Sequence, residues 1–186
     1  MDPKLIMLQV AEALETLDVQ YMLVGSFSSN AYGIPRSTFD ADFVIEATTI
    51  DFGALARALG PDLNVEQQLQ LETVTGRSRY VARHTAVDFT VELFLLDEDP
   101  HNAERFARRR RSNMFGRPVW LPTAEDVVIQ KLRWYGRARR HKDYDDVKDV
   151  LAVQRDNLDF DYIRAWCDRH GTRAILEELL QRLPRV

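Results

Sequence analysis

Two carboxylates on a single predicted strand constrain this chain more than any other feature. Residues 39–45 alternate and are rich in Phe, Val and Ile, as expected of a β-strand. Successive side chains of a strand point to opposite faces, so Asp40 and Asp42 share one face. Like charges so close together repel, and burying them unpaired is costly. The pattern predicts a cation between them, and Mg²⁺ fits because it prefers oxygen ligands and shares them with phosphates. The plainer alternative is a solvated edge strand with two surface aspartates.

The residues before this strand have the character of a phosphate site. An apolar run, residues 21–24, ends at Gly25-Ser26 and precedes a short predicted helix. Backbone N–H groups at such a turn can face a phosphate, while Gly25 permits a close approach and Ser26 adds a hydroxyl. Arg36 and Thr38 follow on the approach to the aspartates and are candidate phosphate contacts. A Gly-Ser turn taken alone is more often only a turn.

Together these residues resemble the signature of the nucleotidyltransferase superfamily related to DNA polymerase beta. The signature joins an apolar strand, a Gly-Ser turn, a helix, an Arg-x-Thr pair and an Asp-x-Asp on the next strand. The matching residues are Gly25, Ser26, Arg36, Thr38, Asp40 and Asp42. The spacer between the turn and the aspartates is longer than in the minimal nucleotidyltransferases of toxin–antitoxin operons and looks more like the abortive-infection toxin branch. The motif covers the first half of the chain, and the second half matches only in general character.

The superfamily also has a third carboxylate on a later strand, and residues 85–96 offer two candidates. Read as one strand, this segment places Asp88, Thr90 and Glu92 on the same face. Asp88 is preferred because its apolar neighbours match the family pattern, and Glu92 stays open as a substitute. The resemblance implies that Asp40, Asp42 and Asp88 hold the metal ions and that Asp88 helps to deprotonate the acceptor.

The expected architecture is α/β, with a nucleotidyltransferase core built on a small mixed sheet over residues 1–121 and a helical C-terminal region over residues 122–186. The first helix of that region, starting at Thr123, carries Lys131 in an otherwise apolar stripe. The resemblance implies that Lys131 faces the nucleotide phosphates, whereas a lysine snorkelling at the edge of the core is the alternative. Asp143 and Asp146 open the next helix, where the helix dipole favours acidic residues. In the abortive-infection branch such aspartates brace basic residues near the site.

Charge is divided unevenly along the chain. Residues 1–100 hold 6 Lys and Arg against 16 Asp and Glu, whereas residues 101–186 hold 19 against 13. The basic half includes Arg108–Arg111, a run expected on a helix that begins near Asn102. A basic half beside a carboxylate site suits a polyanion such as a nucleotide or RNA. The alternative is that the two halves pair with each other.

Targeting signals and disulfides are not expected. The N-terminus has no basic segment leading into an apolar stretch of signal-peptide length, and no apolar run approaches a membrane span. The lone Cys167 lies in a helical, apolar-periodic segment, so it is expected to be a buried thiol without a disulfide. These features predict a cytoplasmic protein with no membrane partner.

The function implied by the resemblance is transfer of a nucleoside monophosphate from a nucleoside triphosphate to an acceptor hydroxyl. Mg²⁺ is the expected cofactor, with Mn²⁺ as a substitute. The basic second half favours an RNA acceptor such as a tRNA end; a protein hydroxyl, in a toxin–antitoxin system with an operon-encoded partner, is the other acceptor. Two alternatives stay open: an aminoglycoside-type enzyme acting on a small molecule, and a catalytically idle fold that binds a partner protein. An Asp88 turned away from the other aspartates, or a Lys131 that plugs the site, would favour the idle fold.

Overall fold

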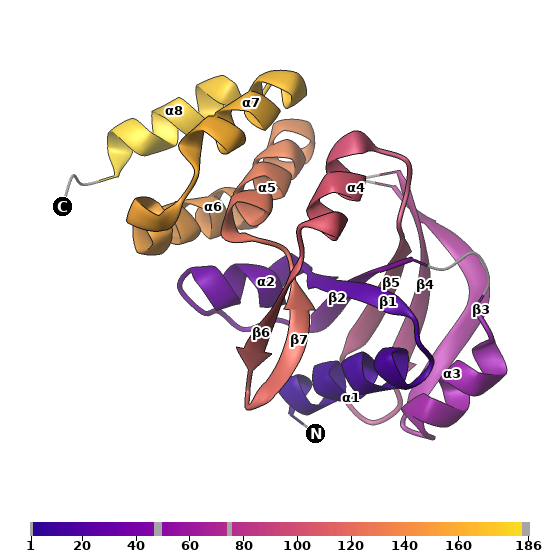
Figure 1. The fold of residues 1–186 in the computed structure, drawn as a ribbon. Coiled ribbons are helices and arrows are strands. Elements are labelled where there is room, and N and C mark those ends of the chain that lie inside the picture. Colours follow the sequence, from indigo (N-terminus) through magenta and orange to yellow (C-terminus); the bar gives the residue numbers. More distant parts are fainter. Residues whose placement is uncertain (1, 47–49, 74–75, 184–186) are drawn as a thin grey trace.

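A five-stranded mixed sheet organises the N-terminal part of the chain (Figure 1). The computed structural model describes residues 2–46, 50–73 and 76–183. The sheet has the order β1-β2-β5-β4-β3. Its strands are β1 (Gln20–Val24), β2 (Asp40–Glu46), β3 (Leu63–Glu72), β4 (Arg77–His84) and β5 (Thr90–Leu95). The β2–β5 pair is parallel and the other neighbours are antiparallel, which confirms the predicted α/β class with a mixed sheet.

The register of the parallel β2–β5 pair decides which side chains lie next to Asp40 and Asp42, at the N-terminal end of β2. Asp40 lies opposite Thr90, and Asp42 lies opposite Glu92. On the other side of β2, Asp42 is paired with Val24, the last residue of β1. Residues directly opposite each other point to the same face of a sheet, so this register places Glu92 beside Asp42.

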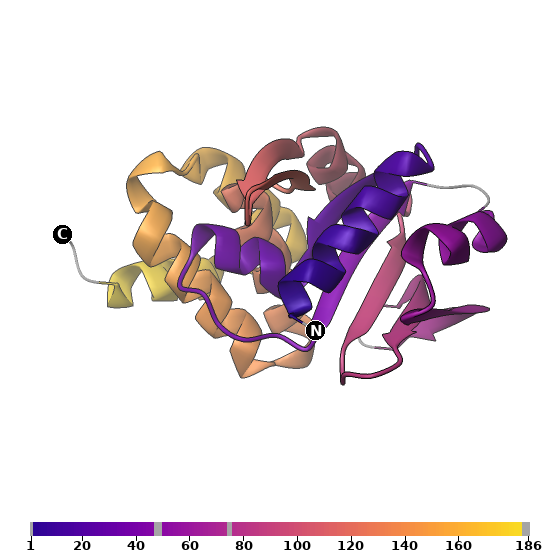
Figure 2. The same ribbon diagram turned by 90° about the horizontal axis from the view of Figure 1, so that it is seen from below.

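Helices cover both faces of the sheet because both faces are apolar. On one face α1 (Pro3–Thr16) and α3 (Phe52–Leu59) lie side by side (Figure 2) and bury residues such as Ile6 and Leu55 against Phe43. On the other face Met22 and Val44 pack with Phe106 of α4 (Pro100–Ala107). This burial holds β2 rigidly in the middle of the fold.

A β-hairpin connects the sheet to the C-terminal helices. Its strands are β6 (Arg110–Met114) and β7 (Arg117–Leu121), and its turn at Phe115-Gly116 uses two residues with positive φ. The arginine run therefore does not lie on a helix as predicted, because α4 ends at Ala107 and Arg110 and Arg111 belong to β6. The strand pairing of the hairpin overrides the local helical pattern.

The remaining chain is helical, as expected. It comprises α5 (Ala124–Ala138), α6 (His141–Gln154), the short 3₁₀ turn η1 (Arg155–Asn157), α7 (Phe160–His170) and α8 (Arg173–Arg182). These helices enclose a second apolar cluster that includes Leu132, Val147 and the buried thiol Cys167. The division at residue 121 stays a prediction, although the two apolar clusters lie on either side of it. In the described ranges no helix is long and apolar enough to cross a membrane.

One helix joins the two parts. The short helix α2 (Gly25–Tyr32) follows β1 directly and packs against α5 and α6 as well as against β2. Its first turn, at Gly25 and Ser26, is buried. The structure therefore brings the Gly-Ser turn, the aspartate strand and the C-terminal helices together at one place.

Candidate active site

Strands β2 and β5 contribute three carboxylates to a cleft of about 170 Å³ between the sheet and helix α5. They are Asp40 and Asp42 of β2 and Glu92 of β5. Gly25 and Ser26 of α2 line the same cleft, as does Lys131 of α5. The structure thus brings together most of the residues that the motif singled out.

Asp88 does not reach this cleft. Strand β5 begins at Thr90, and Asp88 is an exposed residue in the bend that precedes it. The prediction that residues 85–96 form one strand is therefore corrected, and with it the expectation that Asp88 faces the other aspartates. Glu92, which was left open as the substitute, occupies the position beside Asp42. Its carboxylate also pairs with Arg79 of the neighbouring strand at 2.7 Å.

The crowding of carboxylates perturbs their titration. Burial, together with the charges of Asp40 and Glu92, raises the pKa of Asp42 from 3.8 to about 7. Burial and the charge of Asp40 also raise the pKa of Glu92, whereas the guanidinium of Arg79 opposes this rise. Desolvation and like charges both disfavour the ionised form. The cleft is therefore a place where added positive charge is strongly favoured.

The donor set suits a hard divalent cation. Carboxylate oxygens are the ligands that Mg²⁺ and Mn²⁺ prefer, and burial beside two other carboxylates raises the pKa of Asp42 despite the charges of Lys131 and Lys142. Within residues 2–46, 50–73 and 76–183 no three acidic, histidine or cysteine side chains already converge on a common ion position. One reason is that Asp40 is turned toward Thr38, whose hydroxyl donates to its Oδ1 at 2.5 Å. Ligation by all three carboxylates requires Asp40 to turn or to use Oδ2, the oxygen that Thr38 does not engage.

The turn at Gly25 permits the closest approach in the site. Gly25 has φ of +63°, and a Cβ at this position would lie 1.9 Å from Oδ2 of Asp42. Any larger residue would displace the carboxylate. The hydroxyls of Ser28 and Ser29 donate to the Gly25 carbonyl at 2.9 and 3.1 Å and hold the turn. The sequence therefore needs glycine here for both conformation and space.

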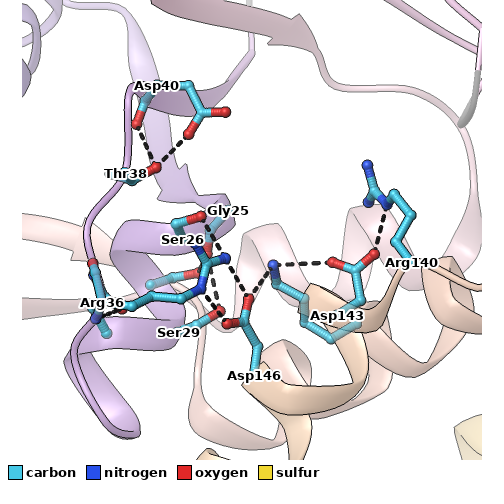
Figure 3. A network of polar contacts seen from close by, with 12 residues as sticks. Gly25, Ser26, Ser29, Arg36, Thr38, Asp40, Arg140, Asp143 and Asp146 are labelled. Atoms are coloured by element: carbon cyan, nitrogen blue, oxygen red, sulfur yellow. Dashed lines mark hydrogen bonds and ion pairs between the residues drawn. The ribbon is translucent and has the colours of Figure 1, made fainter. Parts of the chain in front are cut away.

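The two predicted phosphate-binding cations belong to an ion-pair network (Figure 3). Arg36 donates from Nε and Nη2 to both oxygens of Asp146, at 2.8 and 3.1 Å, and from Nη2 to the Ser26 hydroxyl at 2.9 Å. Lys131, which is 4% exposed, lies 2.7 Å from Asp146 and 3.2 Å from Asp143. Both cations therefore already have carboxylate partners. A direct contact of Arg36 or Lys131 with phosphate stays a prediction.

Asp143 and Asp146 are buried and brace the basic residues, in the manner that the resemblance implies. Asp143 also accepts from Nε of Arg140 at 2.7 Å (Figure 3). The network ties the loop that carries Arg36 to helices α5 and α6. It fixes Ser26 through Arg36, so it positions the turn rather than the carboxylates.

The sequence interpretation missed other residues that line the cleft: Glu72, Phe94, Trp134, Arg140 and Lys142. Trp134 follows Lys131 by one helical turn on α5, so helical spacing places the two on one side of that helix. Arg140 is the N-cap residue of α6, and Lys142 lies in the first turn of that helix. The helical wall of the cleft therefore combines basic and aromatic side chains with Asp143, and the sheet wall combines acidic side chains with Arg79.

A larger hollow of about 840 Å³ adjoins the site, on the side of α1 and the β6–β7 hairpin. Arg36 and Thr38 line it together with apolar residues such as Phe27 and Phe115. It contains none of the three carboxylates. The candidate metal-binding carboxylates therefore lie in the smaller, polar cleft.

Comparisons with known proteins find similarity in structure alone. No protein-family model and no curated protein matches the sequence. The solution structure of the antibiotic-resistance factor ANT(2'')-Ia is 12% identical, with a TM-score of 0.62 over 94% of each chain. The crystal structure of ANT(2")-Ia in complex with adenylyl-2"-tobramycin is 13% identical, with a TM-score of 0.63 over 92% of this chain and 98% of that one. An antigenic nucleotidyltransferase-like protein from Paracoccidioides brasiliensis is 18% identical, with a TM-score of 0.55 over 99% and 94% of the two chains. The similarity spans almost the whole chain and shows the nucleotidyltransferase fold that the motif predicted.

Proposed function

We propose that this chain is an enzyme that transfers a nucleoside monophosphate from a nucleoside triphosphate to an acceptor hydroxyl. The observation that carries the proposal is the position of Asp42, which lies beside Glu92 through the pairing of β2 with β5 and against the Gly25 turn through the pairing of β2 with β1. The raised pKa of Asp42 supports it, because perturbed carboxylates gather where an enzyme binds cations or moves protons. The shared fold is consistent with this activity.

In this proposal Asp40, Asp42 and Glu92 hold Mg²⁺ or Mn²⁺. The bound ions would neutralise the phosphates and activate the acceptor hydroxyl. Glu92 takes over the role first assigned to Asp88 and, with a pKa raised by burial, is suited to accept the proton of that hydroxyl.

The α2 turn binds the phosphates. The backbone N–H groups at Gly25 and Ser26 stand at the start of a helix, where partial positive charge favours an anion. The positive charges of Arg36 and Lys131 lie close to this turn and favour an anion there. Arg36 also orients the Ser26 hydroxyl through its 2.9 Å contact. Thr38 holds Asp40 until a cation draws it away.

An RNA acceptor such as a tRNA end is favoured by the basic wall of the cleft. Lys142 lies there with Trp134 and with Arg140, which also pairs with Asp143, and basic and aromatic groups together suit a nucleic acid strand. The arginines at positions 108–111 support this less than expected, because Arg108 pairs with Asp126 and Arg111 with Glu15. A protein hydroxyl is the second acceptor, in a toxin–antitoxin pair with an operon-encoded partner.

A small-molecule acceptor is the second candidate function. Two of the similar structures are of ANT(2")-Ia, and one of them contains adenylyl-2"-tobramycin. The acidic wall formed by Asp40, Asp42, Glu72 and Glu92 would suit a cationic acceptor of this kind.

The idle, partner-binding alternative is less well supported. Asp88 does lie outside the site, which was one condition for that alternative. Glu92 fills the position instead, so three carboxylates remain in the cleft. Lys131 pairs with Asp143 and Asp146 rather than with the carboxylates of β2, so it does not block them.

The test is transfer of label from each of the four α-³²P nucleoside triphosphates, with Mg²⁺ or Mn²⁺, to bulk tRNA, cell lysate and tobramycin. Glu92→Gln should abolish transfer, and Asp88→Asn is the matched control that should leave it unchanged. The labelled fraction names the acceptor class. If the native chain labels no acceptor, the enzyme proposal fails. If Asp88→Asn abolishes transfer while Glu92→Gln retains it, the assignment of the third carboxylate is wrong.

A further inference from the structure

A small recess lies next to the cleft, behind the turn at the start of α2. Its volume is about 10 Å³, which holds about one water-sized atom. It shares three lining residues with the cleft: Gly25, Lys131 and Trp134. Ser28 of α2, Arg105 of α4 and Gln130 of α5 also line it. An atom in this recess would therefore be next to anything bound at the mouth formed by Gly25 and Trp134.

Arg105 is a buried cation that forms no ion pair with any residue that the structure describes. Its side chain is 2% exposed, and in the described part of the chain neither Nε nor Nη2 has a hydrogen-bond partner. The Oε1 atom of Gln130, a residue that is 5% exposed, also lacks one. A buried charge without a partner is among the most costly arrangements in a protein.

The acidic residues around Arg105 are engaged elsewhere. Asp97 pairs with Arg77 at 3.1 Å. Asp126 accepts from the hydroxyl of Tyr162 at 2.8 Å and lies 3.3 Å from both His101 and Arg108. No carboxylate of the described ranges lies within ion-pair distance of Arg105. Burial and the charge of Arg77 lower the pKa of Arg105 to about 9, so the guanidinium still carries its charge at pH 7.

The guanidinium of Arg105 lacks an acceptor at the recess, and an anion would supply both an acceptor and a countercharge. The α2 N-terminus at Gly25 adds partial positive charge on the same side. The amide of Gln130 can present its NH₂ group to an anion by turning about its last torsion. A whole phosphate does not fit in about 10 Å³, but one of its oxygens does.

We propose that Arg105 and Gln130, together with the start of α2, bind one phosphoryl oxygen from the terminal phosphates of a nucleotide in the cleft, or from the pyrophosphate that leaves. This assignment to a nucleotide rests on the proposed function. Arg36 and Lys131 already pair with Asp146 and Asp143. Arg105 has no such partner, so its charge is available to the phosphoryl oxygen.

Replacing Arg105 by an uncharged side chain of similar length should affect stability and anion binding in opposite directions. Without an anion, the buried charge of Arg105 destabilises the fold, so the replacement should raise the free energy of unfolding. With an anion, the same replacement removes the cation that binds it, so anion affinity should fall. A purely structural arginine would lose stability in both conditions.

The test compares Arg105→Met with Arg117→Met, which removes an exposed cation from the hairpin. Calorimetry without metal, in EDTA, measures binding of orthophosphate, pyrophosphate, tripolyphosphate and ATP. The native chain and Arg117→Met should bind pyrophosphate, tripolyphosphate and ATP more tightly than orthophosphate. Arg105→Met should bind them at least about tenfold more weakly, while its anion-free unfolding midpoint in urea stays equal to that of the native chain or rises. Arg105→Lys, which keeps a charge in the recess, should bind with intermediate affinity.

Three results would overturn the inference: unchanged pyrophosphate binding by Arg105→Met, no anion binding by the native chain, or a lowered anion-free midpoint of Arg105→Met. Orthophosphate bound as tightly as pyrophosphate would overturn the assignment to a nucleotide tail. Failure of this inference can be told apart from failure of the enzyme proposal. If the chain transfers no label but binds pyrophosphate through Arg105, the anion site is supported and the enzyme proposal fails. If the chain transfers label but its pyrophosphate binding does not depend on Arg105, the enzyme proposal is supported and the anion site fails.

Discussion

Replacing Asp42 by asparagine should stabilise the metal-free protein at neutral and alkaline pH. Asp42 titrates with a pKa of about 7 in the fold, against 3.8 for an ordinary aspartate. Between these values the folded state holds a proton that the unfolded state has lost, so the free energy of unfolding falls as pH rises from about 4 to 7. A difference of about 3 pKa units corresponds to about 4 kcal/mol. This is an upper limit, because Asp42 and Glu92 titrate as an interacting pair.

The assay is urea unfolding of the native chain and Asp42→Asn in EDTA, from pH 4 to pH 8.5. The two should be about equally stable at pH 4, where Asp42 is protonated and resembles asparagine. Above pH 7 the variant should be more stable by up to about 4 kcal/mol. Asp88→Asn is the matched control, because it removes an exposed carboxyl outside the cleft and should give a curve parallel to that of the native chain. If Asp42→Asn also gives a parallel curve, the charge repulsion assigned to the cleft is absent.

Three further predictions concern the same cleft. Gly25→Ala should lower the free energy of unfolding by at least about 1 kcal/mol in urea, because φ is +63° and the new Cβ would strike the carboxylate of Asp42; an unchanged value would show that the turn relaxes freely. Lys131→Met should cost about 3 kcal/mol in the same assay, since Asp143 and Asp146 lose a buried countercharge; a variant as stable as the native chain would show that the arginine partners suffice. Mg²⁺ binding at pH 6.5 should release a proton as the pKa of Asp42 falls from about 7, and binding at pH 9 should release none. Calorimetry in buffers of different ionisation enthalpy measures the number of protons released. Binding heats at pH 6.5 that do not depend on the buffer would refute this prediction.

The parts of the site that lie close together in sequence were predictable. Alternation alone places Asp40 and Asp42 on one face of a strand, and a glycine before a short helix marks a tight turn. These features depend on local geometry that a few residues determine. The structure places both in the same cleft.

The third carboxylate was not predictable from the pattern, for a physical reason. Asp88 and Glu92 are four residues apart, so a period of two assigns them to the same face and cannot choose between them. The choice depends on where the strand begins, and Thr90 begins it because it lies opposite Asp40, fifty residues earlier in the chain. Such non-local pairing leaves no signal in the segment itself.

The carboxylate partner of Arg36 could not be predicted from the sequence, because this contact is also non-local. The contact between Arg36 and Asp146 joins residues 110 positions apart. Arg105 gave no sign of its burial, because arginine is ordinarily exposed. The segment that was expected to be an arginine-rich helix formed a hairpin instead, because each of its strands gained a partner.

The parallel pairing of β2 and β5 also affects how the chain folds. The loop that this pairing closes contains two antiparallel strands and a helix, so the entropy of closing it must be overcome before the carboxylates meet. Repulsion between Asp42 and Glu92 opposes this closure, whereas the β4–β5 pairing does not bring these two side chains together. A divalent cation that neutralises them would favour the pairing of residues that lie fifty positions apart. The ion proposed for chemistry would therefore also stabilise the non-local part of the sheet.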